Sequence, residues 1–327
     1  MTMLARGRAS TPRSGTRKDF LSILDFEPED LERCLERSAE VKADRALGAE
    51  APTARLLSGR HVAMLFEKSS LRTRSTFEIA VRELGGHVVE LKPETALGDR
   101  EPVADVARNL ERWVEAVVIR TFSQRVLEQF AAAAKRLHVV NALTDEEHPC
   151  QAVSDCLTLR EHWGSLRGRT IAYVGDGNNV AVSLAHAAAM LGVHVHMASP
   201  EGYQLRHIAV EEATNVARHG ARLRLFTDPA DAVAGADAVY TDTWTSMGRE
   251  AEAGMRREVF ARYQVNEELM AIAKPDALFM HCLPAHRGEE VTAGVIESRS
   301  SIVFDQAENR LHCQKGLLTM LISPTRA

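Results

Sequence analysis

The sequence predicts an α/β protein of two domains, each a parallel sheet flanked by helices. Short runs rich in β-branched residues alternate with helical patterns, and this alternation restarts after a helix expected near residues 150–162. Such alternation is typical of parallel strands joined by crossover helices. The length of 327 residues also fits two domains, each large enough to bury its own core.

The first half of the chain opens with a helical pattern over 20–42, in which Pro28, Glu29 and Asp30 are typical of a helix start. The expected strands of this half are 61–66, 87–91, 116–120 and 137–142. Helices are expected from the polar cluster after residue 66 to residue 84, and over 102–113 and 123–136.

The second half repeats this order of elements. Its expected strands are 169–177, 193–198, 222–226, 237–242, 277–282 and 301–306, and a helix is expected over 179–191. In open parallel sheets, ligands bind outside the carboxyl ends of the strands. Chemically dense stretches lie at the ends of four of the expected strands, at 67–74, 120, 242–248 and 281–284, and a fifth opens a helix at 148–151. This coincidence predicts a ligand site at the strand ends.

Composition excludes several classes of protein. A net charge of −5 and an isoelectric point near 6.2 argue against a general nucleic-acid binder, so any anion site must be built locally. Five cysteines without a CxxC pair fit a reducing cytosol, and no stretch approaches the roughly 18 apolar residues of a membrane helix. Residues 1–18 hold five basic and no acidic side chains. They fit a transit peptide or a disordered basic tail, and the tail is favoured because folded-looking sequence begins near Asp19. We expect a cytoplasmic protein.

The stretch "FEKSSLRTRSTFE" (66–78) contains three cations and five hydroxyl side chains. A hydroxyl-rich loop that opens a helix offers free N–H groups and the positive end of the helix dipole. Ser70 and Thr73 add hydroxyl donors, and Arg72 can bind two oxygens of a phosphate at once. The alternative is an ordinary helix cap with solvated arginines, but the position at a strand end favours phosphate. The stretch lacks the glycine-rich pattern of nucleotide hydrolases.

Two further stretches open helices. In "HPCQ" (148–151), His148 and Gln151 could serve a carbonyl oxygen and an amino group, although a helix cap is the simpler alternative. "GDGNN" (175–179) evokes dinucleotide binding, but Val180 replaces the third glycine. Its asparagines, Asn178 and Asn179, could instead bind an amino-acid carboxylate.

Two stretches follow strands near the C-terminus. In "TDTWTSMG" (241–248), Asp242 suits an ammonium group, and its alternative role is a helix cap. In "HCLP" (281–284), Cys282 is either a packing residue or a candidate for thiolate chemistry. The main-chain carbonyl of Leu283 could accept a hydrogen bond from an NH₂ group.

Taken in order over roughly residues 19–320, these stretches resemble the aspartate/ornithine carbamoyltransferase family. The matching elements are SSLRTR, Arg120, HPCQ, GDGNN, DTWTSMG, HCLP and AENR (307–310). Aspartate-specific relatives lack the SMG and HCLP elements, so the resemblance is to the ornithine branch.

The resemblance implies roles for individual residues. The carbamoyl phosphate site would comprise Ser70, Leu71, Arg72, Thr73, Arg120, His148, Gln151, Cys282, Leu283 and Arg310. L-Ornithine would be held by Asn179, Asp242, Ser246 and Met247. Arg120, His148 and Cys282 would act in catalysis, with no metal or cofactor. Two departures stand out, because Leu71 and Ala96 replace an expected threonine and glutamine.

The resemblance also implies an organisation. Residues 19–150 would bind carbamoyl phosphate, residues 151–307 would bind ornithine, and a helix over 308–322 would return to the first domain. A homotrimer, or a multiple of trimers, is expected, with small-molecule substrates and neither nucleic acid nor membrane as partners. Alternatives are a carbamoyltransferase for acetylornithine, succinylornithine or putrescine, a nicotinamide-dependent oxidoreductase, and a non-catalytic paralogue.

Overall fold

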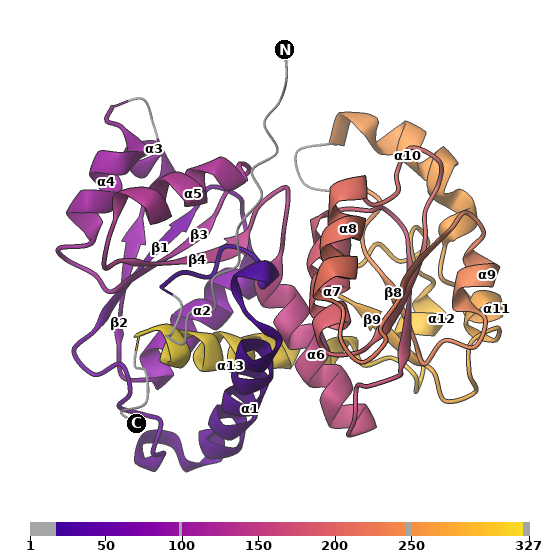
Figure 1. Cartoon of the computed structure of the whole chain (residues 1–327), viewed down its shortest axis with the longest axis horizontal. Helices are drawn as coiled ribbons and strands as arrows, with labels where there is room; N and C mark the ends of the chain where they lie inside the picture. The colour runs from indigo at the N-terminus through magenta and orange to yellow at the C-terminus, as the bar shows by residue number, and fades with distance from the viewer. Residues whose placement is uncertain (1–17, 98–99, 246–249, 323–327) are drawn as a thin grey trace.

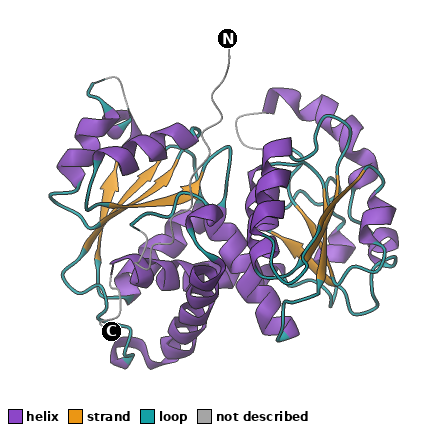
Figure 2. Cartoon of the chain, viewed as in Figure 1, coloured by secondary structure: helices purple, strands orange, loops and turns teal. Residues whose placement is uncertain are grey.

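The computed structural model describes residues 18–97, 100–245 and 250–322, which form two α/β units side by side (Figure 1). The first unit has a four-stranded sheet of order β2-β1-β3-β4, and the second a five-stranded sheet of order β7-β6-β5-β8-β9. Every pair of neighbouring strands is parallel. Figure 2 shows helices on both sides of each sheet. The predicted fold class is confirmed.

The strands are β1 His61–Phe66, β2 His87–Leu91, β3 Ala116–Arg120, β4 His138–Leu143, β5 Thr170–Val174, β6 His194–Ala198, β7 Leu223–Phe226, β8 Ala238–Thr241 and β9 Leu278–His281. The longer helices are α1 Pro28–Asp44, α2 Leu71–Glu83, α4 Val103–Leu110, α5 Gln124–Ala133, α6 Pro149–Trp163, α7 Asn179–Met190, α8 His207–Val216, α10 Ala253–Phe260 and α13 Val303–Ile322. Short helices are α3 Pro93–Ala96, α9 Pro229–Val233, α11 Glu267–Met270, α12 Ala293–Ile296, η1 Ile23–Asp25, η2 Arg45–Glu50, η3 Glu250–Glu252 and η4 Ala261–Tyr263.

Local chemistry explains where several elements form. The central strand β3 is buried along its whole length, which matches its continuous apolar sequence and its place between two helical layers. Proline at the first position starts α1 and α6. The side chain of Asn178 accepts hydrogen bonds from the main-chain N–H groups of Val180 and Ala181, and so caps α7.

Two predictions about elements were wrong. Residues 301–306, predicted as a strand, contain the start of α13 at Val303, and Ser301 makes only an isolated bridge to Phe279. A short apolar run at the start of a buried helix has no periodicity that distinguishes it from a strand. The helical pattern expected over 20–42 extends too far toward the N-terminus, because Phe20 instead makes a parallel bridge to Val140 of β4. The helix start indicated by Pro28 is confirmed, since α1 begins there.

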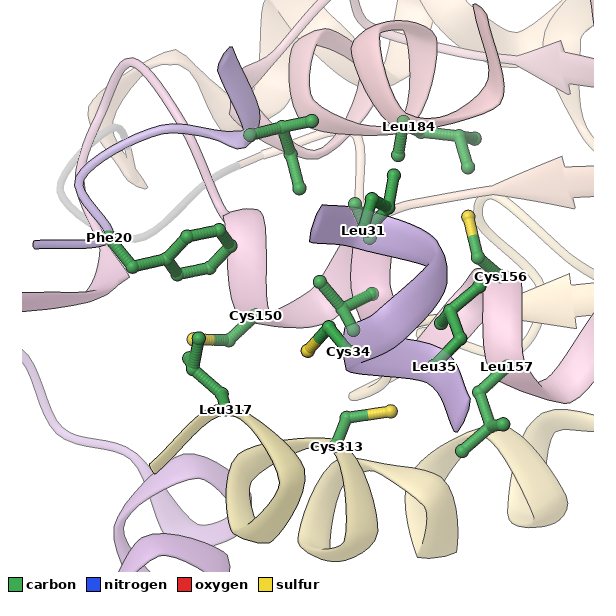
Figure 3. Close-up of a cluster of buried hydrophobic side chains, with 14 of the residues drawn as sticks. Phe20, Leu31, Cys34, Leu35, Cys150, Cys156, Leu157, Leu184, Cys313 and Leu317 are labelled. Carbon is green, nitrogen blue, oxygen red and sulfur yellow. The ribbon is translucent and has the colours of Figure 1, made fainter. Parts of the chain in front are cut away.

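Helix α13, near the C-terminus, packs against helices of the first unit. It packs against α1, α2 and α6 (Figure 1). The contact with α1 is close, because a Cβ atom on Gly316 would lie 2.9 Å from the main-chain nitrogen of Ser38. In the core between these helices, Cys34, Cys150 and Cys313 lie near one another (Figure 3).

This core continues from one unit into the other through α6 and α7, so the two sheets share apolar packing. All five cysteines are free and buried. Among the residues that the structure describes, no helix has the length and apolar character needed to cross a membrane. The division of the chain at residue 150 stays a prediction.

Candidate active site

The carboxyl end of β1 leads into α2 through the hydroxyl-rich loop. Ser70 stands at the N-cap of α2 with an extended backbone, and its side chain makes no capping hydrogen bond. Thr73 is buried, whereas the side chain of Leu71 is 77% exposed. Because its side chain points to solvent, Leu71 can serve a ligand at the start of α2 only through its main chain. The first turn of α2 presents N–H groups without helical partners and the positive end of the dipole.

The three cations in this stretch differ in their partners. Lys68 pairs with Asp145 and lies over the ring of Phe122, and Arg74 pairs with Glu90 on the surface. Arg72 is half-buried and forms no ion pair with a carboxylate among the described residues. Its pKa is lowered by burial.

Arg72 is joined by two more arginines. Arg120, the last residue of β3, is 5% exposed, and Arg310 of α13 is 2% exposed. Burial, followed by repulsion from Arg310 and Arg72, lowers the pKa of Arg120 to about 10. In the part of the chain that the structure describes, none of the three arginines pairs with a carboxylate. The site therefore concentrates positive charge that an anionic ligand would neutralise.

Arg310 joins the C-terminal helix to two other elements. Its guanidinium donates to Thr73 Oγ1 at 2.6 Å and to Gln151 Oε1 at 2.7 Å. Gln151 in turn donates to Asp155 Oδ1 at 2.8 Å. Two of the predicted carbamoyl phosphate residues are thus brought together by Arg310.

A buried network that sequence reasoning missed supports Gln151. Asp155 also accepts hydrogen bonds from Gln306 Nε2 at 2.7 Å and from the hydroxyl of Tyr240 at 3.1 Å. Burial raises the pKa of Asp155 to about 7, although these hydrogen bonds oppose the increase. The partners come from α6, α13 and β8, and their separation in sequence leaves no local pattern that could reveal the network.

His148 stands at the N-cap of α6. Burial and the nearby Arg310 and Arg120 lower its pKa well below the usual value, so the imidazole is neutral. Its Nδ1 atom is buried and has no hydrogen-bond partner among the described residues. A neutral imidazole offers one N–H donor, which suits a carbonyl oxygen.

The second half of the site lies at the ends of β8 and β9. The thiol of Cys282 donates to Asp242 Oδ1 at 2.9 Å, and Asn178 Nδ2 donates to Asp242 Oδ2 at 2.8 Å. Burial, followed by the negative charge of Asp242, raises the pKa of Cys282 well above its usual value. This environment favours the neutral thiol, not the thiolate considered from the sequence.

The loop after Cys282 is held by a buried acid. The peptide bond between Leu283 and Pro284 is cis, and Leu283 has a φ of 58°. The main-chain N–H of Leu283 donates to His281 Nδ1 at 2.8 Å, so the other ring nitrogen carries the proton and donates to Glu290 Oε1 at 3.1 Å. Burial opposes ionisation of Glu290, but hydrogen bonds from His281 and His286 outweigh it and lower the pKa.

The chain matches the models of one protein family over nearly its whole length. Residues 18–161 match the family described as "Aspartate/ornithine carbamoyltransferase, carbamoyl-P binding domain", and residues 167–321 match its "Asp/Orn binding domain". The chain belongs to the aspartate/ornithine carbamoyltransferase family. The predicted resemblance is confirmed.

Individual relatives of this carbamoyltransferase family member are similar over nearly their whole length. The ornithine carbamoyltransferase of Anoxybacillus flavithermus is 48% identical over 307 residues, which is 93% of this chain and 96% of the relative. That of Symbiobacterium thermophilum is 49% identical, covering 94% and 98% of the two chains. The solved ornithine carbamoyltransferase of Pyrococcus furiosus superimposes with a TM-score of 0.90 at 45% identity, covering 94% and 98%.

In this carbamoyltransferase, the glycines of "GDGNN" have a structural reason that does not involve a dinucleotide. Gly175 has a φ of 145°. A Cβ atom on Gly177 would lie 2.5 Å from the main chain of Gln204 and Leu205, so protein backbone occupies the space beside this glycine. In dinucleotide-binding folds the second glycine admits the pyrophosphate. The geometry therefore argues against the nicotinamide-dependent oxidoreductase considered as an alternative from the sequence.

Two predicted ornithine residues, Ser246 and Met247, lie outside the described residues. Trp244 lies just before them, and Arg256 of α10 donates a hydrogen bond to its main-chain oxygen. Arg256 also donates to Asp176. Arg256 is buried and lies over the rings of Tyr203 and Phe260, at 4.8 and 5.2 Å. Sequence reasoning missed this residue, because its helix carries it among several other charged side chains.

Proposed function

We propose that the protein transfers the carbamoyl group of carbamoyl phosphate to the δ-amine of L-ornithine, giving L-citrulline and phosphate. The observation that most supports this activity is the group of buried or half-buried arginines, Arg72, Arg120 and Arg310, beside the start of α2. Such a group suits a dianionic phosphate. The second substrate, L-ornithine, is inferred from the relatives, which are named ornithine carbamoyltransferases.

The phosphate is held by Arg72, by the hydroxyls of Ser70 and Thr73 and by the main-chain N–H of Leu71. Arg120 and Arg310 complete its charge balance. The carbonyl oxygen of the carbamoyl group accepts from His148, and its amino group faces Gln151 and the main-chain carbonyl of Leu283. This assignment fits a neutral His148 and a Gln151 already oriented by Arg310.

L-Ornithine binds with its α-amino group at Asp242 and its α-carboxylate near Asn179, Ser246 and Met247. The amide of Asn179 donates to the main-chain oxygen of Thr144, so ornithine competes with that contact. Cys282 lies beside the δ-amine, where a neutral thiol bound to Asp242 can receive or relay a hydrogen bond without adding negative charge.

The chemistry follows from the charges. The neutral δ-nitrogen forms a bond to the carbamoyl carbon, the bond from this carbon to the phosphate oxygen breaks, and the amine proton leaves with the phosphate. Negative charge grows on the carbonyl oxygen in the transition state, where Thr73, Arg120 and His148 stabilise it. Arg72, Arg120 and Arg310 stabilise the departing phosphate.

We also propose an organisation for the protein in the cell. It assembles as a homotrimer or a multiple of trimers, and acts in the cytoplasm in arginine biosynthesis. The free cysteines support a reducing compartment, and the names of the relatives are consistent with a step of arginine biosynthesis. Light scattering on the protein as it elutes from a size-exclusion column measures the mass of the assembly, and so tests the proposed trimer.

Activity toward a panel of amines tests the proposed reaction. Phosphate release from carbamoyl phosphate is followed with L-ornithine, acetylornithine, succinylornithine and putrescine. The proposal predicts that L-ornithine has the highest kcat/KM. A preference for an amine that lacks a free α-amino or α-carboxylate group would contradict the roles given to Asp242 and Asn179.

A further inference from the structure

A buried acid lies between the N-terminal segment and α7, outside the set of residues assigned to substrates. Glu147 is 8% exposed and precedes His148 directly. Its carboxylate accepts a hydrogen bond from the hydroxyl of Ser22 and one from the main-chain N–H of Ile23 at 3.4 Å. A third comes from the hydroxyl of Ser183 on α7, at 2.8 Å.

Ser183 connects this acid to the site. Its hydroxyl oxygen also accepts from the main-chain N–H of His148 at 2.9 Å. A hydroxyl has one proton, and Ser183 gives it to Glu147, so its lone pairs are directed to other donors such as His148. The N–H of His148 lies at the N-cap of α6 and has no partner within that helix. The main chain of His148 is therefore attached to α7.

A second contact joins the same helix to the same turn. Asn179 lies four residues before Ser183, and thus on the same face of α7. Its amide donates to the main-chain oxygen of Thr144, whose N–H donates to the main-chain oxygen of Glu147 at 2.9 Å. Two successive turns of α7 hold the turn 144–148 that ends at His148.

We propose that Glu147 and Ser183 are positioning residues of the transfer reaction, which couple the ornithine side of the site to the placement of His148 on the carbamoyl phosphate side. The proposal rests on the proposed function, since only that function gives the two sides their ligands. Ornithine acts on α7 through Asn179, and Ser183 transmits the position of α7 to the main chain of His148. Glu147 holds the hydroxyl of Ser183 in the orientation that accepts from His148.

This coupling depends on pH. Burial raises the pKa of Glu147 to about 7, opposed by its hydrogen bonds to Ser22 and Ser183. The charged and titratable groups that face it are Asp25 of the N-terminal segment and His186 of α7, whose Nδ1 lies 3.9 Å away and whose Nε2 lies 3.7 Å from Glu212 of α8. Above pH 7 the carboxylate accepts from all three donors. Below pH 7 the protonated acid must itself donate from one oxygen, and its hold on Ser183 weakens.

The test measures coupling directly in the full-length protein. The two probes are phosphonoacetamide, a stable analogue of carbamoyl phosphate, and norvaline, which is ornithine without the δ-amine. The coupling ratio is the Kd of norvaline alone divided by its Kd with saturating phosphonoacetamide. The variants are Ser183→Ala and Glu147→Gln. The control is Ser38→Ala, since Ser38 has a buried hydroxyl that donates to Cys34 within α1, away from the site.

We expect a ratio well above 1 in the parent and in Ser38→Ala, and a ratio at least fivefold smaller in Ser183→Ala. The kcat of Ser183→Ala should fall about tenfold, with the KM for carbamoyl phosphate within about threefold of the parent. Glu147→Gln should lose the rise in coupling between pH 6 and 8 that the parent shows.

Two results separate this inference from the proposed function. A parent that neither forms citrulline nor binds phosphonoacetamide overturns the proposed function. The positioning role alone is overturned if the parent forms citrulline but has a coupling ratio of 1. It is also overturned if the coupling ratio is unchanged in both variants. If Ser183→Ala does not fold, Glu147→Gln decides the question through its pH dependence.

Discussion

Replacing Arg120 with methionine should increase the stability of the unliganded protein and strongly weaken its binding of carbamoyl phosphate. The pKa of Arg120 falls from its usual value to about 10, first through burial and then through Arg310 and Arg72. The folded protein therefore holds this proton about 3 kcal/mol less favourably than the unfolded chain. Arginine is protonated in both states at pH 7, so the cost is present at every pH below about 10. Methionine matches the aliphatic part of the arginine side chain and carries no charge, so it removes the cost.

The expected gain in the free energy of unfolding for Arg120→Met is about 1–3 kcal/mol, because lost packing offsets part of the relief. The affinity for phosphonoacetamide should fall by about 2–5 kcal/mol, or roughly 30- to 5000-fold, since a buried charge partner of the anion is lost. Urea unfolding and calorimetric titration measure the two quantities. A variant that is less stable than the parent, yet binds phosphonoacetamide equally well, would refute the reasoning.

Three further predictions concern the ornithine side and the buried acids. Cys282→Ser should raise the KM for ornithine and lower kcat while phosphonoacetamide binding changes less than about twofold; parental kinetics in the folded variant would remove Cys282 from the site. Asp242→Asn should lower the pKa of the Cys282 thiol, because a negative neighbour is removed, so the pH midpoint of iodoacetamide alkylation should fall; an unchanged midpoint contradicts the Cys282–Asp242 contact. The folded protein keeps a proton on Asp155 up to about pH 7, whereas the unfolded chain releases it above about pH 4, so stability should decline as pH rises between these values, by up to about 4 kcal/mol. Asp155→Asn should reduce that decline in urea unfolding, and an identical decline in parent and variant would argue against the shifted pKa.

The position of the site could be predicted from the sequence, because parallel strands direct their carboxyl ends to one edge. The residues at the carboxyl ends of β1, β3, β8 and β9 were identified from local patterns of apolar runs that end in polar side chains. Arg310 was different. It lies 237 residues from Thr73, and only the family resemblance assigned it to the carbamoyl phosphate site.

The buried contacts that orient Gln151 through Asp155 could not be predicted from the sequence. Tyr240 and Gln306 meet Asp155 only after three distant segments have packed together, and no spacing in the sequence marks them. The start of α13 at Val303 was missed for a related reason. Ile302 and Val303 are buried, whereas Phe304 and Asp305 are exposed, and so short a run shows no period that distinguishes the start of a helix from a strand.

The most direct test of the account is the identity of the carbamoylated nitrogen. Carbamoyl phosphate labelled with ¹³C at its carbonyl is incubated with L-ornithine and the purified protein, and the product is examined by NMR. Asp242 is proposed to hold the α-amino group, with the δ-amine near Cys282 and the arginines. The labelled ureido carbon should be attached to the δ-nitrogen, as in L-citrulline. Label on the α-nitrogen, or no enzyme-dependent transfer of label, would contradict it.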